Sequence, residues 1–282
     1  MNKYKIKLAF SPCPNDTFIF NALVNGHIDT EGIDFEILLA DVQELNQMAF
    51  HQTNDITKLS FNAYGLASSN YILLESGSAL GRGCGPLLIN KTGMLPPKPE
   101  EALIAIPGIN TTANLLLSIC FPQLGNKKEM LFSDIVEAVL TDKAQAGLII
   151  HESRFTFGDK GLKKVADLGD LWEKQTGLPI PLGGIAAKRS LPTDIIQKVN
   201  HLISKSIQWA WEHPDSGQDF IARHANEMSA SVIHQHIQLY VNEFSVNLGT
   251  DGKHAISSLL KAGESLAYYT LPELPLFAGE LK

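Results

Sequence analysis

Hydrophobic and polar positions follow two different periodicities, one typical of strands and one of helices, along the first two-thirds of the chain. From Ile33 to Leu39, the apolar residues Ile33, Phe35 and Ile37 alternate with acidic residues, a pattern typical of a half-buried strand. Short apolar runs that predict further strands recur at 5–10, 55–59, 71–74, 87–90, 102–106, 146–150 and 183–187. Helical spacing separates these runs, and strands that alternate with helices predict an α/β fold with a mainly parallel sheet.

Helix-start residues accompany the helical segments. Asn15 or Asp16 is placed to cap a helix over 17–24, Asp41 precedes another helix, and Thr111 opens a third. The last third of the chain is predicted to be mostly helical, with long helices from residue 191 onward and around 232–241 and 255–266, at the spacing of an amphipathic helix.

The order of the strands predicts two lobes. The strand at 87–90 can carry the chain into a second lobe, and the strand at 183–187 can bring it back. The larger lobe is then 1–89 plus 183–282, and the smaller lobe is 90–182. A length of 282 residues agrees with about two domains. This arrangement places a cleft between the lobes.

Composition excludes several classes of protein. The formal charge is −7, and no basic stripe that would bind nucleic acid or anionic lipid is present. Pro12 and Pro14 interrupt the short apolar stretch near the start, so no secretory segment or membrane span is predicted. Three widely spaced cysteines do not form a disulfide framework. We expect a cytoplasmic protein, and the sequence leaves its oligomeric state open.

Candidate chemistry lies where predicted strands end, because ligands of parallel α/β sheets bind beyond the carboxyl ends of the strands. His151 follows the apolar strand 146–150, and an imidazole that titrates near neutral pH can act as a proton-abstracting base. A histidine that only makes local hydrogen bonds is the alternative. Other residues at strand ends are Ser11, Lys58, Ser60 and the segment 108–112.

Two of these positions suit an anionic ligand. Thr111 and Thr112 stand at a helix start, where free amides and the helix dipole attract anions, although ordinary capping would use the same residues. Lys58 and Ser60 offer an ammonium group and a hydroxyl to a carboxylate, whereas a solvated lysine beside a turn serine is the alternative. We therefore expect a small carboxylated molecule as the ligand.

Other motifs carry less chemistry. Gly81-Arg-Gly-Cys-Gly85 precedes a strand rather than a helix, so close backbone packing or a flexible connection is favoured over phosphate binding, although Arg82 is free to face the cleft. His151 begins a sequence like HExxH, but Phe155 replaces the second histidine, so no metal is predicted. His234 and His236 diverge on a helix and are expected on a solvated face.

Five strings, taken together and in order, resemble one family. They are SPCPNDTF at 11–18, TKLS at 57–60, SALGRGCGP at 78–86, PGINTTA at 107–113 and GLIIHESRF at 147–155. The chain resembles 1,4-dihydroxy-6-naphthoate synthase of the futalosine route to menaquinone. The resemblance continues through GLPIPLG at 177–183 and the helical tail, so it covers nearly the whole sequence.

The resemblance implies a two-lobed periplasmic-binding-protein-like (type II) fold with a cleft between the lobes. It implies a carbon–carbon lyase that converts cyclic dehypoxanthine futalosine to 1,4-dihydroxy-6-naphthoate, with no metal and no redox cofactor. The family's catalytic histidine falls on His151, and its substrate-binding residues fall on Lys58, Leu59, Ser60, Thr112 and Ala113. Residues Ile109-Asn110, in a loop that varies within the family, leave the fine geometry of the ligand open.

Two other functions compete with the lyase. A non-catalytic solute-binding protein for a small carboxylate would share the fold, since a fold alone does not decide function. A thiol-dependent enzyme would use Cys13 or Cys84, but no neighbour in the sequence activates either thiol.

Overall fold

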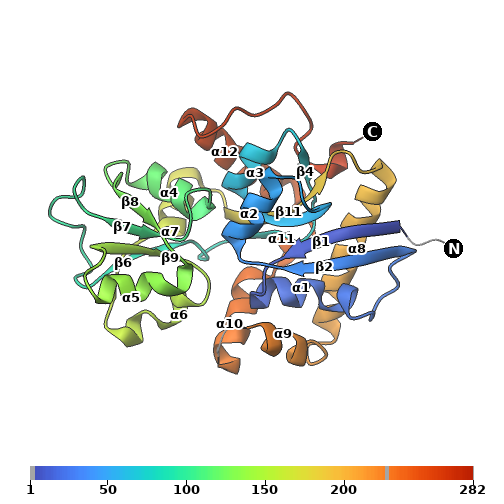
Figure 1. Ribbon diagram of the computed structural model, residues 1–282, viewed down its shortest axis with the longest axis horizontal. Coiled ribbons are helices and arrows are strands. Elements are labelled where there is room, and N and C mark those ends of the chain that lie inside the picture. Colours follow the sequence, from blue (N-terminus) through green and yellow to red (C-terminus); the bar gives the residue numbers. More distant parts are fainter. Residues whose placement is uncertain (1–3, 226–228, 282) are drawn as a thin grey trace.

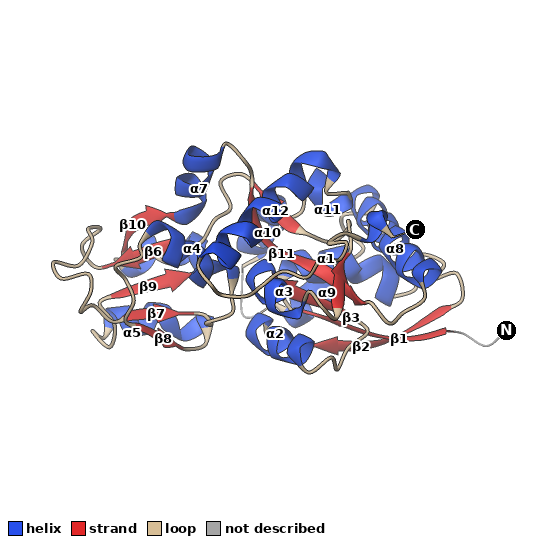
Figure 2. Ribbon diagram, turned by 90° about the horizontal axis from the view of Figure 1, so that it is seen from above, coloured by secondary structure: helices blue, strands red, loops and turns tan. Residues whose placement is uncertain are grey.

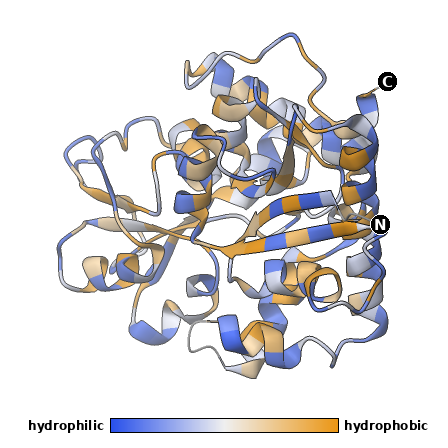
Figure 3. Cartoon of the chain, turned by 45° about the vertical axis from the view of Figure 1, so that its right-hand side comes forward, coloured by the Kyte–Doolittle hydropathy of each residue, from blue (hydrophilic) through white to orange (hydrophobic). Residues whose placement is uncertain are grey.

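The computed structural model describes residues 4–225 and 229–281. The predicted lobe of 1–89 plus 183–282 also includes residues 1–3, 226–228 and 282, which lie outside these ranges. Two β-sheets occupy two parts of the molecule that lie side by side (Figures 1 and 2). Hydrophobic and hydrophilic residues alternate along the long strands at the centre of Figure 3, and hydrophilic residues fill many of the connecting loops. No helix within the described residues is long and apolar enough to cross a bilayer.

The first sheet has the strand order β2-β1-β3-β11-β4, and β5 also pairs with β11. Strand β1 is parallel to β2 and β3, but β11 is antiparallel to β3, β4 and β5. The sheet is therefore mixed rather than mainly parallel, because β11 brings the chain back from the second sheet. The strands are β1 Tyr4–Phe10, β2 Ile33–Leu39, β3 Ile56–Ser60, β4 Tyr71–Leu73, β5 Ala79–Gly81 and β11 Ile180–Lys188.

The second sheet has the order β10-β6-β9-β7-β8 and is built from one continuous stretch of chain. Strand β7 is parallel to β8 and β9, whereas β6 is antiparallel to β9 and β10. Edge strand β8 was not predicted because its three residues, KKE, include no apolar side chain. The strands are β6 Leu87–Asn90, β7 Ile104–Ile106, β8 Lys127–Glu129, β9 Ala146–Ile149 and β10 Lys163–Asp167.

Helices cover both sheets. In Figure 1, helices α2, α3 and α12 lie on one face of the first sheet, and α1, α9 and α10 lie on the other. The helices are α1 Pro14–Val24, α2 Val42–Phe50, α3 Phe61–Ala67, α4 Thr112–Cys120, α5 Ile135–Leu140, α6 Ser153–Thr156, α7 Leu168–Thr176, α8 Thr193–Glu212, α9 Gln218–His224, α10 Ala230–Tyr240, α11 Glu243–Val246 and α12 Gly249–Ser265. Short 3₁₀ helices lie at Phe132–Asp134, Gly158–Lys160 and Ala278–Glu280.

Helix α1 differs from its prediction in a way that matters for the site. Its N-cap is Cys13, with no side-chain capping bond, and Pro14 occupies the first helical position, where its missing N–H costs nothing. Asn15 and Asp16 are therefore not caps. They lie in the first turn, both buried, and their side chains are free to make other contacts.

The core under the first sheet joins α1 and α8 to β1. Phe10 and Phe20 stack with their ring centroids 4.4 Å apart, and Ile203 and Ile207 of α8 are fully buried in the same cluster. Ser206 is the polar residue of this helix–helix contact, and its hydroxyl donates to the carbonyl of Ile19 at 2.6 Å. This packing fixes α1, and with it the residues at the helix start.

Two glycines allow the loop after β5 to lie against α7. A Cβ added to Gly85 would lie 2.2 Å from the backbone nitrogen of Gly169, closer than real Cβ contacts. The segment Gly81-Arg-Gly-Cys-Gly85 thus serves close backbone packing. Of the two interpretations that the sequence favours, packing rather than a flexible connection is the one observed.

We predict that Gly85→Ala destabilises the protein by about 1–3 kcal/mol, because the added methyl group overpacks a backbone contact that cannot relax easily. Chemical denaturation measures this loss. Gly125→Ala is the matched control, since a Cβ there meets nothing within 4 Å, and it should change stability by less than about 0.5 kcal/mol. Equal stability of the two variants would contradict the packing argument.

Candidate active site

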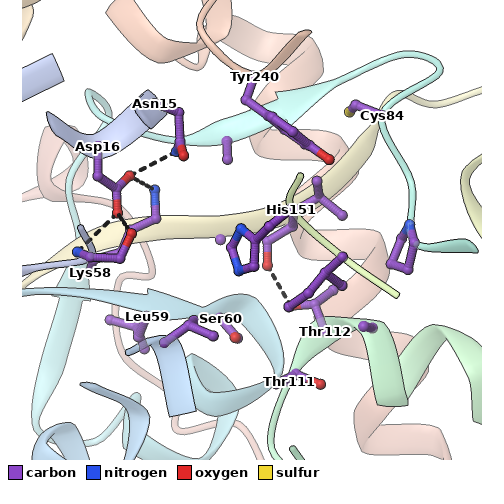
Figure 4. Close-up of a pocket in the computed structure, with 18 of the residues that line it drawn as sticks. Asn15, Asp16, Lys58, Leu59, Ser60, Cys84, Thr111, Thr112, His151 and Tyr240 are labelled. Atoms are coloured by element: carbon purple, nitrogen blue, oxygen red, sulfur yellow. Dashed lines mark hydrogen bonds and ion pairs between the residues drawn. The ribbon is translucent and has the colours of Figure 1, made fainter. Parts of the chain in front are cut away.

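A cavity lies between the two sheets and receives residues from both (Figure 4). The cavity has an empty volume of about 700 Å³, which includes open solvent at its mouth. This volume is within the range of small-molecule binding sites. Its lining residues are Ser11, Asn15, Asp16, Val42, Lys58, Leu59, Ser60, Ala79, Cys84, Pro86, Thr111, Thr112, Ala113, Ile150, His151, Leu182, Gly183, His236 and Tyr240.

The catalytic and substrate-binding residues that the family resemblance implies all lie in the wall of this cavity. Lys58, Leu59 and Ser60 form the carboxyl end of β3 in the first sheet. Thr112 and Ala113 form the first turn of α4, which follows β7 of the second sheet, and His151 follows β9. The strand-end rule therefore located one shared cavity, although it does not by itself assign a role to any residue.

The start of α4 presents backbone amides rather than hydroxyls. Thr111 is the N-cap, and its Oγ1 accepts from the Asn114 amide at 3.2 Å while it donates to the Gly108 carbonyl. The Thr112 hydroxyl donates to the Leu182 carbonyl at 2.6 Å. Both hydroxyl protons are used, so neither threonine hydroxyl is free to donate to a ligand. The amides of Thr112 and Ala113 have no intrahelical acceptor by position and are available to an anion.

Ser60 adds a further donor from the first sheet. Its backbone amide donates to Oδ1 of Asn46 at 2.9 Å, and its hydroxyl oxygen accepts from Nδ2 of Asn46 at 3.2 Å. The serine hydroxyl proton is not used in either bond. Asn46 thus fixes the serine oxygen and leaves its O–H as a donor on the cavity side of β3.

Lys58 forms a buried ion pair, which contradicts the alternative of a solvated lysine. Its Nζ lies 2.8 Å from Oδ1 of Asp16, and the two side chains are 7% and 1% exposed. Ser11 donates to the other oxygen of Asp16 through its hydroxyl at 2.7 Å and through its amide at 3.2 Å. Figure 4 shows this cluster along one wall. The ammonium charge is therefore balanced inside the protein, and Lys58 is no isolated cation.

His151 has a constrained backbone and one occupied ring nitrogen. Its φ is +54°, a left-handed conformation that is uncommon outside glycine and is frequent at functional sites. The Cys13 sulfur lies 3.5 Å from Nδ1, and the ring of Phe132 packs edge-on with centroids 5.1 Å apart. Since Cys13 occupies Nδ1, Nε2 is the nitrogen left for a ligand.

Burial and neighbouring charges have opposing effects on the pKa of His151. Burial lowers the pKa of His151, but the charge and hydrogen bond of the Cys13 sulfur raise it, and the carboxylates of Glu152 and Asp41 add to that effect. The net pKa is raised to about 9. Cys13 therefore strengthens the imidazole as a base, and it delays the loss of the imidazole proton to higher pH.

The position of His236 contradicts the prediction that both His234 and His236 lie on a solvated face. His234 and His236 do diverge on α10, and His234 is exposed, but His236 is fully buried in the cavity wall. Burial, followed by the charge of His151, lowers the pKa of His236 to about 3. The apolar spacing of Ile233, Ile237 and Tyr240 marks the buried face of α10, and this signal could have identified His236 from the sequence.

Arg82, which the sequence leaves free to face the cleft, lies outside the cavity lining, and so does Arg154. Arg82 is largely exposed, where it pairs with Glu173 and donates to the Gly177 carbonyl. Arg154 pairs with Asp167 at 2.7 Å and donates to the carbonyls of the loop after β5. These cations hold the loop against α7 and β10, so they do not reach a ligand in the cavity.

The cysteines differ in their surroundings. Burial raises the pKa of Cys84 to about 12, so its thiolate is disfavoured and a nucleophilic role does not fit. Cys13, by contrast, contacts His151, a partner that no neighbour in the sequence revealed. Within the described ranges, no group of three or more His, Cys, Asp or Glu residues could hold a metal ion.

Two sheets with a cavity between them define a periplasmic-binding-protein-like fold. The aliphatic sulphonate binding protein of Escherichia coli superimposes with a TM-score of 0.66 at 10% identity, over 94% of this chain and 88% of that protein. A family model described as menaquinone biosynthesis matches residues 6–265. The chain belongs to the menaquinone biosynthesis family.

Closer relatives agree with this membership. The 1,4-dihydroxy-6-naphthoate synthase of Thermus thermophilus is 41% identical over 96% of this chain and 98% of that protein. The synthase of Streptomyces coelicolor is 39% identical over 92% of this chain and 93% of that protein. A solved structure from Archaeoglobus fulgidus, 33% identical, has a TM-score of 0.88 over 93% of this chain and 98% of that chain.

We predict that Asp16→Asn lowers stability by about 3–5 kcal/mol, because it leaves the Lys58 charge buried without a partner. The double variant Asp16→Asn/Lys58→Met removes both charges and should recover much of this loss. Equilibrium unfolding of the three proteins measures the difference. A double variant no more stable than the single one would show that the ion pair is not the source of the effect.

We predict that Cys13→Ala moves the acidic limb of the kcat/KM profile to lower pH. A histidine that acts as a general base must be deprotonated, so the hypothesis that His151 is the base predicts that activity rises as pH passes the pKa of His151. Removal of the sulfur removes the main effect that raises that pKa. The profile of the wild-type protein should rise toward about pH 9. An unshifted limb would mean that Cys13 does not set the basicity of His151.

Proposed function

We propose that this chain is a 1,4-dihydroxy-6-naphthoate synthase, a lyase that converts cyclic dehypoxanthine futalosine to 1,4-dihydroxy-6-naphthoate in menaquinone biosynthesis. The observation that carries the proposal is the cavity itself. In a chain of this family, it places an imidazole and a helix start from the second sheet opposite the end of β3 from the first sheet. Family membership supplies the reaction, and the cavity supplies a place for it.

The substrate carboxylate binds at the start of α4 in this proposal. The amides of Thr112 and Ala113 donate to it at the positive end of the helix dipole, and the Ser60 hydroxyl donates from the opposite wall. Leu59 is fully buried and supplies apolar surface for the ring system. Lys58 acts through Asp16 and fixes the wall of the cavity rather than neutralising the ligand alone.

His151 acts as the base. Its Nε2 takes a proton from a carbon next to a carbonyl group of the substrate, and the C–H electron pair is delocalised into that carbonyl as an enolate. Elimination from this enolate releases the sugar-derived fragment. Nδ1–H donates to the Cys13 sulfur, which orients the ring and stabilises the imidazolium that forms. The rigid left-handed turn after β9 holds the base in place while the substrate is anchored at α4.

Approach of the two lobes completes the site in this proposal. Residues 1–89 plus 183–282 carry Ser60, and residues 90–182 carry His151 and the start of α4, so a ligand that bridges them is enclosed when they close. Closure excludes water from the base. The three cysteines are free thiols, which agrees with a reducing compartment, and we place the reaction in the cytoplasm.

A thiol mechanism is the second candidate, favoured by the 3.5 Å distance between Cys13 and His151. In that mechanism the sulfur attacks the substrate and the imidazole only accepts its proton. The Cys13→Ala protein decides between the two. The base mechanism retains turnover with a shifted pH profile, whereas the thiol mechanism loses turnover at every pH.

We predict that His151→Gln lowers kcat at least about a hundredfold, because a positioned general base contributes at least that much. Conversion of the cyclic substrate to the naphthoate, followed by chromatography, measures it. His234→Gln, an exposed histidine of the same protein, is the matched control and should turn over at the wild-type rate. A wild-type protein that binds the cyclic substrate without converting it would favour a solute-binding protein instead.

A further inference from the structure

His236 has one ring nitrogen with a partner and one without. The side chain is 0% exposed in the cavity wall, and its Nε2 lies 3.1 Å from Oδ1 of Asn15. Its Nδ1 is buried and has no hydrogen-bond partner among the described residues. Buried polar atoms of native proteins nearly always have a partner. The ring of a residue that lines the ligand cavity therefore has one nitrogen whose hydrogen-bonding capacity is not used by the described residues.

The neighbouring groups fix which nitrogen carries the proton. Nδ2 of Asn15 donates to Oδ1 of Asp16 at 2.9 Å, the same oxygen that accepts from Lys58. If the amide of Asn15 were reversed, its oxygen would face the carboxylate. The amide oxygen must therefore face His236, and because it can only accept, Nε2 of His236 carries the proton. Nδ1 of a neutral ring is then a hydrogen-bond acceptor.

The environment keeps that ring neutral. Burial and the charge of His151 both oppose a second proton on His236, so the pKa of His236 lies far below neutral pH. A neutral ring with its proton on Nε2 cannot donate through Nδ1, so it does not bind a carboxylate there. It does not compete with His151 as a base either. Its remaining function is to accept a hydrogen bond from an O–H or N–H group of a ligand.

We propose that Nδ1 of His236 accepts a hydrogen bond from a hydroxyl group of the substrate and so selects hydroxylated ligands. The rings of His151 and His236 are nearly parallel, 9° apart, with centroids separated by 6.1 Å. The two rings therefore lie close together in the wall of one cavity. The inference rests on the proposed function for the identity of the substrate, but the acceptor itself follows from the hydrogen-bond network.

Two conservative variants separate the nitrogens. His236→Gln places an amide nitrogen where Nε2 lies, which keeps the contact with Asn15 and removes the acceptor. His236→Asn places an amide oxygen where Nδ1 lies, which keeps the acceptor and loses that contact. We expect His236→Gln to lose about tenfold in kcat/KM through a higher KM, the effect of one neutral hydrogen bond, and His236→Asn to lose less. A purely structural histidine would show the opposite order, and that result overturns the proposal.

A direct measurement does not depend on turnover or on these variants folding. The His151→Gln protein, labelled with ¹⁵N in its imidazole rings, is titrated with the intact cyclic substrate. We expect the Nδ1 signal of His236 to move upfield, as for an unprotonated nitrogen that gains a hydrogen bond. An unchanged Nδ1 signal at saturation overturns the proposal. Failure of the wild-type protein to form product would instead overturn the proposed function, so the two failures are distinguishable.

Discussion

The carboxylate of Asp16 is the group on which the geometry of the cavity depends. One of its oxygens accepts from Lys58 and Asn15, and the other accepts from Ser11. These donors lie directly after β1, at the start of α1 and near the carboxyl end of β3, so one buried charge links two strands of the first sheet and a helix. A buried charge without its partner would be strongly unfavourable, so loss of either Asp16 or Lys58 destabilises the whole cluster.

The same network gives two histidines different properties. Cys13 contacts His151 and favours its charged form, whereas burial and the neighbouring charge keep His236 neutral. Environments that shift the pKa values of two neighbouring titratable groups in opposite directions usually mark an acid–base site. Here His151 is suited to take a proton and His236 to hold a neutral polar group, although both are histidines.

Much of the architecture could be predicted from the sequence, and most of the site's contacts could not. Periodicity located β2 to the residue and placed His151 at a strand end, because strands and their ends are local features. It missed the direction of β11, which depends on where the chain returns. It also missed the pairing of Cys13 with His151, 138 positions apart, and of Asn15 with His236, 221 positions apart. Only tertiary folding brings such partners together.

The position of β11 has a consequence for how a nascent chain acquires this structure. β11 pairs with β3, β4 and β5, yet it begins at Ile180, after the whole second sheet has been translated. The second sheet comes from one continuous segment and can assemble as soon as that segment leaves the ribosome. The first sheet must wait with its inner edge open until the last strand arrives, because long-range pairings form late. Its exposed strand edge is then the part of the newborn protein most in need of chaperone protection.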